Sequence, residues 1–180
     1  MRAPRTTFMV ILTALLLAVS VRPAASQGVE EQAQLYQRIG EAEVPSETIR
    51  LAEQFLERYP DSTRRIAVAG QALQAAGELD PDGELTAEWA DTYLTEYRKR
   101  TPPYDAFNSA AWQLFQMEAR LDLAAAWADS ALAAIPSGAP GRVYAMVEDT
   151  KANVAFARGD RETAVDVMRS AVEHDPGNAG

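Results

Sequence analysis

Apolar side chains recur every three or four positions through most of the chain, and each such run stops near a glycine or a proline. The run that begins at Pro45, for example, stops at Pro60. This spacing places the apolar side chains on one face of an α-helix, and proline cannot continue the helix that it follows. The pattern predicts four pairs of helices. The pairs occupy residues 29–60, 61–102, 103–136 and 142–176.

The last two pairs repeat one another at a fixed spacing. Six positions recur forty residues later: Trp112, Ala119, Ala124, Ala128, Ala131 and Pro136 are followed by Ala152, Gly159, Ala164, Met168, Ala171 and Pro176. Small residues at fixed positions are typical of helices that approach closely in a repeated hairpin. Weaker copies end at Pro60 and Pro102. In the second copy eight extra residues separate Gly70 from Ala90, and we assign them to a longer acidic turn at 78–84.

This order of small, apolar and proline positions resembles the tetratricopeptide repeat family, and the resemblance covers residues 29–176. It implies an all-α fold: a right-handed α-solenoid of about four antiparallel helical hairpins, whose concave groove holds a peptide or another protein. The chain departs from the family pattern at Asn108 and Glu148, where a bulky residue is usual. The lysine-rich carboxylate clamp of some members is missing, since Lys99 and Lys151 are the only lysines.

The resemblance also implies that groove positions come from the first helix of each hairpin. Carried over by spacing, the candidate partner-binding residues are Gln37, Arg64, Gln71, Gln74, Gln113, Gln116 and Asn153. Amide side chains both donate to and accept from a peptide backbone, so such a row suits an extended segment of many sequences. The alternative is an ordinary solvated helix surface, because glutamine is a good helix former.

Residues 1–26 have the pattern of a secretory signal peptide. Arg2 and Arg5 precede an apolar stretch at 8–21, and small residues stand before a cut after Ser26. The stretch is shorter than the roughly 20 residues that a permanent membrane helix needs. We therefore expect a periplasmic or secreted protein without a membrane span after cleavage, with an uncleaved anchor as the alternative. The style of this signal and the Ala/Arg-rich composition indicate a bacterial source.

Charge narrows the class of partner. Residues 27–180 carry 14 basic and 26 acidic side chains, a net charge of −12. Such a surface repels phosphate backbones and anionic lipids, so nucleic-acid binding is excluded. Cysteine is absent, which excludes disulfides and thiolate chemistry. His174 is the single histidine.

The acidic segment 80–86 partly matches a calcium-binding EF-hand loop. Trp89, however, stands where the bidentate carboxylate of such a loop belongs. We therefore interpret the segment as a turn in which Asp82 or Thr86 caps the following helix. No metal ligand or cofactor is expected from it.

The aromatic residues are expected to pack between helices, and the histidine is expected to stabilise a helix end. Trp89, Tyr93 and Tyr97 follow one another at four-residue intervals, which is typical of a buried helix face. Trp112 is likewise expected to pack between helices, with a ligand-stacking role as the less favoured alternative. His174 ends the last predicted helix, where a cation interacts favourably with the helix dipole, and no catalytic residue is predicted.

Together these features predict a non-catalytic protein-binding scaffold that acts outside the cytoplasm. The alternative is the repeat portion or a subunit of an exported enzyme, such as a thioredoxin-like reductase. A repeat domain with a role that no residue reveals is a third reading. Only residues 177–180 follow the last hairpin, without the polar capping helix of most repeat arrays. This end has two interpretations: a truncated gene product, or a surface on which a partner or a second copy of the chain stacks.

Overall fold

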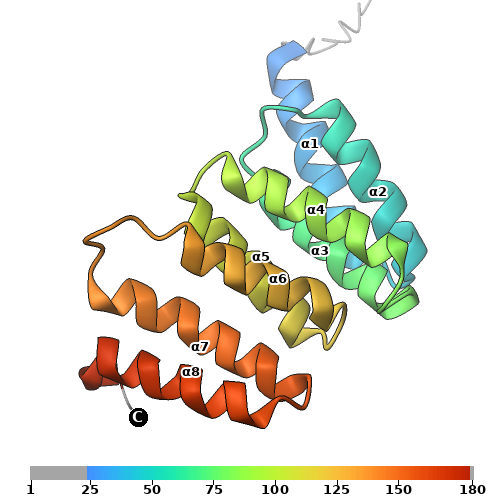
Figure 1. Ribbon diagram of the computed structural model, residues 1–180. Coiled ribbons are helices and arrows are strands. Elements are labelled where there is room, and N and C mark those ends of the chain that lie inside the picture. The colour runs from blue at the N-terminus through green and yellow to red at the C-terminus, as the bar shows by residue number, and fades with distance from the viewer. Residues whose placement is uncertain (1–23, 179–180) are drawn as a thin grey trace, which may run out of the picture.

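The computed structural model describes residues 24–178, and its regular elements are all helices (Figure 1). The all-α prediction is therefore confirmed. The predicted signal peptide lies outside the described residues, apart from its last three, which begin the first helix. The elements are α1 (Ala24–Glu41), α2 (Pro45–Arg58), α3 (Arg65–Leu79), α4 (Glu84–Arg98), α5 (Pro103–Gln116), α6 (Leu121–Ala133), α7 (Gly141–Ala157), α8 (Arg161–His174) and a short 3-10 turn (Pro176–Asn178).

The helices follow one another through space in chain order, from α1 and α2 at one end to α7 and α8 at the other (Figure 1). Each helix packs against the next, and α1 also contacts α3 while α5 also contacts α7. Alanine at the crossing points lets the helix axes come close. The alanines with no exposed surface are Ala52, Ala69, Ala72, Ala76, Ala90, Ala106, Ala110, Ala111, Ala119, Ala124, Ala128 and Ala131.

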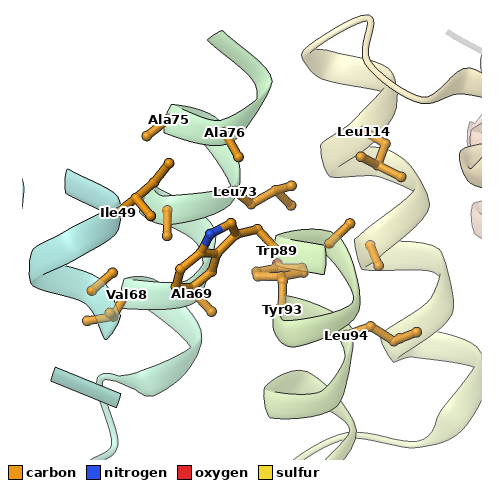
Figure 2. Close-up of a cluster of buried hydrophobic side chains, with 14 of the residues drawn as sticks. Ile49, Val68, Ala69, Leu73, Ala75, Ala76, Trp89, Tyr93, Leu94 and Leu114 are labelled. Atoms are coloured by element: carbon orange, nitrogen blue, oxygen red, sulfur yellow. The ribbon is translucent and has the colours of Figure 1, made fainter. Parts of the chain in front are cut away.

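Larger apolar side chains fill the remaining space between the helices. Trp89 and Tyr93 of α4 are buried, as predicted, and Figure 2 shows their rings between the ribbons of α3 and α4, close to Leu73. Gly70 of α3 lies directly against one of these rings, since a Cβ atom at Gly70 would lie 3.4 Å from the Tyr93 ring. Tyr97 is half-buried, and its ring centroid lies 5.5 Å from that of Tyr93.

One ion pair joins three helices. The guanidinium of Arg65, at the start of α3, donates to both carboxylate oxygens of Glu96 in α4, over 2.9 and 2.7 Å. It also donates to the main-chain oxygens of Leu56 and Tyr59 at the end of α2. The hydrogen bond from Arg65 lowers the pKa of the Glu96 carboxyl, against the opposing effect of burial. This carboxylate is therefore ionised and paired in the folded protein.

The turn between α3 and α4 is not eight residues longer than the turns of the other hairpins, so that prediction is wrong. It spans residues 80–83, four residues like the turn 117–120 between α5 and α6. The extra residues lie in the helices instead: α3 continues nine residues beyond Gly70, whereas α5 continues four beyond Trp112. Because these two turns have the same length and the extra residues lie in α3 and α4, Gly70 and Trp112 do not occupy equivalent places in their hairpins.

The capping prediction for this turn is also corrected. Gly83 precedes α4, and the side chain that accepts from the first turn of α4 is that of Asp80, through the Leu85 N–H at 3.3 Å. The Thr86 hydroxyl donates to the main-chain oxygen of Asp80 over 2.6 Å. Asp80 is the better cap because it approaches the free N–H groups from outside the helix. The same turn is joined to the next hairpin by Arg120, whose main-chain N–H donates to the Pro81 oxygen over 3.1 Å.

Candidate binding site between helices α5, α7 and α8

The seven predicted groove residues do not form one continuous row of free side chains. Gln37 donates to Glu41 over 2.7 Å, and the Asn153 amide donates to the main-chain oxygen of Asp149 over 2.9 Å. The guanidinium of Arg64 lies over the Tyr36 ring, 4.5 Å from its centroid. These three side chains are therefore engaged within the chain. Gln113 is half-buried and Gln116 exposed.

Gln71 and Gln74 do lie together, on a hollow of about 400 Å³ between α3 and the connection from α1 to α2. Thr48 of α2 and Glu43 of the connection also line it. The side-chain oxygen of Gln71 is buried and has no hydrogen-bond partner within the described residues. Two of the predicted residues thus share a concave surface.

A larger hollow, of about 540 Å³, opens between α5, α7 and α8. Its floor and walls combine apolar side chains with a few polar groups. The lining residues are Asn108, Trp112, Ala145, Met146, Asp149, Thr150, Met168, Ala171, Val172 and Asp175. A concave, mainly apolar site with a few polar groups is the usual form of a ligand-binding site.

Helical spacing explains why these residues share one surface. Trp112 lies four residues after Asn108 on α5, and Val172 lies four residues after Met168 on α8. Residues four apart lie above one another on the same face of a helix. On α7, Met146 and Thr150 follow the same rule. Each helix therefore presents one face to the hollow.

The apolar lining is unusually open to solvent. Met146, Met168 and Val172 are 40%, 38% and 41% exposed, although all three are large hydrophobic residues. Trp112 is only half-buried, and its ring contacts that of Phe115 at a tilt of 40°, with centroids 5.1 Å apart. Contiguous exposed apolar side chains in a concave surface mark a place where another molecule binds.

Asn108 is the unusual polar residue of this site. It is 8% exposed, and its side-chain oxygen has no hydrogen-bond partner within the described residues. An unpaired buried polar group costs about 1–3 kcal/mol of stability. Since no bond fixes the amide, rotation about its last side-chain torsion can present either the NH₂ group or the oxygen to a ligand.

Two carboxylates stand on the hollow without partners. Asp149 of α7 and Asp175, which follows α8, both line it. Within the described residues, neither side chain makes a hydrogen bond or an ion pair, whereas Lys151 pairs with Asp129 over 2.7 Å. No basic side chain lines the hollow. Its polar rim is therefore acidic.

The α8 wall is held in place by Glu148, which is buried next to the hollow. Its carboxylate accepts from the Ser170 hydroxyl over 2.8 Å and lies 2.8 Å from Nδ1 of His174. The imidazole also stacks on the Tyr144 ring, with centroids 5.1 Å apart. His174 thus has specific partners, beyond the helix dipole considered from the sequence. The serine contacts the carboxylate rather than the imidazole, so the group is a structural clamp and has no nucleophile–base pair.

Sequence reasoning missed this site although two of its signals were visible. Asn108 and Glu148 are the two positions where the chain departs from the bulky residue of the repeat pattern. The side-chain oxygen of Asn108 has no hydrogen-bond partner within the described residues, and Glu148 contacts His174 of the α8 wall. A polar residue at a position that a fold normally fills with an apolar one is a signal for function.

No family model, curated protein or solved structure matches this chain. Within residues 24–178, no helix is long and apolar enough to cross a membrane. In the same range, no group of three or more histidine, aspartate or glutamate side chains is arranged to hold a metal ion. The chemistry of the site has to be read from its own residues.

Proposed function

We propose that this protein is a non-catalytic scaffold of the tetratricopeptide type, in which four helical hairpins stack as a right-handed α-solenoid and capture a peptide or protein segment. Part of the helix packing supports this architecture: α1 contacts α3 and α5 contacts α7, as the first helices of successive hairpins would, while α3 and α5 have no comparable contact. The recurring alanine positions of the last two hairpins support it as well.

The observation that carries the binding role is the hollow between α5, α7 and α8. It joins open apolar side chains to an unpaired buried amide at Asn108. The amide is suited to a main-chain N–H or C=O group of a peptide, while the methionines adapt to different apolar side chains. A bound peptide would cover the exposed apolar surface and satisfy the amide together.

The pattern of residues 1–26 supports export, so the place of action is the periplasm or the outside of the cell. Mass spectrometry of the protein recovered from that compartment is expected to give an N-terminus at Gln27. An intact N-terminus in the membrane fraction would instead favour the anchored form.

Peptide capture is tested by selecting binders from a random peptide library and measuring their affinity by fluorescence anisotropy. The double variant M168A/V172A removes apolar surface from the α8 wall and is expected to weaken binding about tenfold. Phe156→Ala is the matched control, because Phe156 is exposed on α7 and does not line the hollow. Failure to select any binder, or binders that bind M168A/V172A as well as the unaltered protein, would reject the proposal.

A second candidate role, self-association, is favoured by the exposed apolar side chains of α8. Val165, Met168 and Val172 are exposed at intervals of three and four residues. Arg161 and Asp175 stand at opposite ends of the same face, so two antiparallel copies would bring opposite charges together in a two-fold interface.

Sedimentation velocity over a range of concentrations tests this second role. Val165 does not line the hollow, so Val165→Glu is expected to abolish a dimer without changing peptide affinity. Peptide and second copy compete for Met168 and Val172, and saturating peptide should shift a dimer toward monomer. A monomer at all concentrations would remove this role and leave peptide capture standing.

A further inference from the structure

We infer that the hollow between α5, α7 and α8 recognises a peptide segment in which a lysine or arginine side chain lies beside a large apolar residue. The inference rests on the proposed peptide-binding function and adds the chemistry of the partner. It is carried by Asp149 and Asp175 on the rim, by the apolar wall and by the amide of Asn108.

The charge of the rim selects a cation. Both carboxylates lack partners within the described residues, and the lining contains no basic side chain that could neutralise them. Arg169, which follows Met168 in the sequence, is already paired with Asp166 over 2.9 Å. A lysine or arginine from outside would meet two negative charges without having to displace an internal partner. The formal net charge of the whole chain, −9, attracts such a segment over longer distances.

The apolar wall selects the neighbouring residue. Trp112, Met146, Met168 and Val172 line the hollow together, and the three aliphatic ones are exposed. Covering them with a leucine, methionine or aromatic side chain removes apolar surface from water, which favours binding. The long stem of lysine or arginine packs along the same surface while its charged head stays at the rim.

The amide of Asn108 orients the segment. It is the single amide side chain in the lining, and its oxygen has no partner within the described residues. A main-chain group of the bound segment can pair with this amide, because peptide N–H and C=O groups match both of its ends. An acidic segment is disfavoured in every register, since it would face the carboxylates without a compensating cation.

The probe for this inference is a fluorescein-labelled library peptide that contains an adjacent leucine–lysine pair, compared with peptides in which the lysine is norleucine or glutamate. Norleucine keeps most of the stem and removes the charge. We expect the norleucine peptide to bind about fivefold to tenfold more weakly and the glutamate peptide not measurably. The preference should shrink when sodium chloride is raised, because the rim charges are screened.

The protein side of the experiment is the double variant D149N/D175N, with Asp91→Asn as the matched control. Asp91 is an exposed carboxylate on α4, away from the hollow. The double variant should bind the lysine peptide about fivefold to tenfold more weakly and should bind the norleucine peptide as before. Melting curves that match the unaltered protein confirm that both variants are folded.

The outcomes separate the inference from the proposed function. If no peptide binds, the function itself is wrong. If lysine and norleucine peptides bind equally, peptide capture stands and the cation preference is overturned. If acetylation of the peptide N-terminus removes binding while the norleucine change does not, the site recognises a terminal ammonium group, and the assignment to a side chain is overturned. A preference for lysine that D149N/D175N leaves unchanged would place the cation elsewhere and overturn the assignment to this rim.

Discussion

The carboxylate of Glu148 holds the side chain of His174, with Oε2 2.8 Å from Nδ1 of the imidazole. Through this contact α7 fixes the end of α8, and the second carboxylate oxygen accepts from Ser170 one turn earlier on the same helix. This buried side chain therefore contributes two specific contacts to the packing of α8 on α7. Three helices form the hollow, and this clamp sets the distance between two of them.

Glu148→Ala is expected to lower the free energy of unfolding by about 1–3 kcal/mol, because it removes two hydrogen bonds to a charged group and leaves their partners unpaired. The loss should be concentrated in α8. Hydrogen exchange followed by mass spectrometry should show faster exchange in residues 161–174 than in α3. Glu173→Ala, at an exposed position of α8, is the control and should change neither quantity. Uniform exchange in both variants would show that the clamp is unimportant.

The Arg65–Glu96 ion pair makes the free energy of unfolding depend on pH. Because Arg65 lowers the pKa of Glu96 in the folded state, this carboxylate stabilises the fold above its unfolded pKa, and the contribution is lost as the pH falls through the lower, folded pKa. Chemical unfolding of the unaltered protein should therefore show a decline in stability at acidic pH.

In Glu96→Gln, part of that acid-induced loss of stability should disappear. Stability at neutral pH should fall by about 3–5 kcal/mol, because the charge of Arg65 loses its carboxylate partner and keeps only main-chain acceptors. The reference is Glu57→Gln, which changes an exposed carboxylate of α2. An acid decline of the same size in Glu96→Gln and the unaltered protein would contradict this account.

Gly141 begins α7 against the end of α8. A Cβ atom there would overlap the main-chain oxygen of His174, which cannot move without shifting the helix end. Gly141→Ala is expected to lower the melting temperature by several degrees, in keeping with a loss of about 1–3 kcal/mol from overpacking. At Gly40 in α1 an added Cβ meets nothing within 4 Å, so Gly40→Ala should be neutral or slightly stabilising. Calorimetry of the two variants checks the contrast.

A substitution at Asn108 is expected to change the stability of the fold and the affinity for peptide in opposite directions. Asn108→Leu replaces an unpaired buried amide with an apolar group, so the free energy of unfolding should rise by about 1 kcal/mol. The same change removes the amide that the proposed peptide contacts and should weaken peptide binding about tenfold. Denaturant unfolding and anisotropy titration of one preparation measure both effects. Lower stability together with unchanged binding would show that the amide has a packing role only.

The sequence by itself determined the helices. Apolar spacing, glycine and proline predicted all eight α-helices of residues 24–178, because helix formation depends on residues three and four apart in the sequence. It also predicted that Trp89 and Tyr93 are buried. The alanine repeat indicated close helix contacts for the same local reason, since a small residue at a fixed turn has few other uses.

The length and position of the turn in the second hairpin follow from the tertiary structure and not from the local sequence. Eight extra residues between Gly70 and Ala90 are compatible with a long turn or with longer helical segments, and the two choices have the same local propensities. Packing selected the second, because Asp80 caps α4 and Arg120 bonds to the Pro81 oxygen of the same short turn. The length of the α3–α4 turn is thus set by contacts between residues about forty positions apart, which a local sequence pattern does not show.

The candidate site was likewise decided by tertiary structure. Asn108, Met146 and Met168 stand on three helices, and only their packing makes one hollow of them. Burial of the Asn108 amide without a partner is a property of its surroundings, and the sequence shows only that a polar residue stands in an apolar place. Periodicity reports which face of a helix is buried. Which faces meet, and where they leave space, depends on the side-chain volumes of all the helices together.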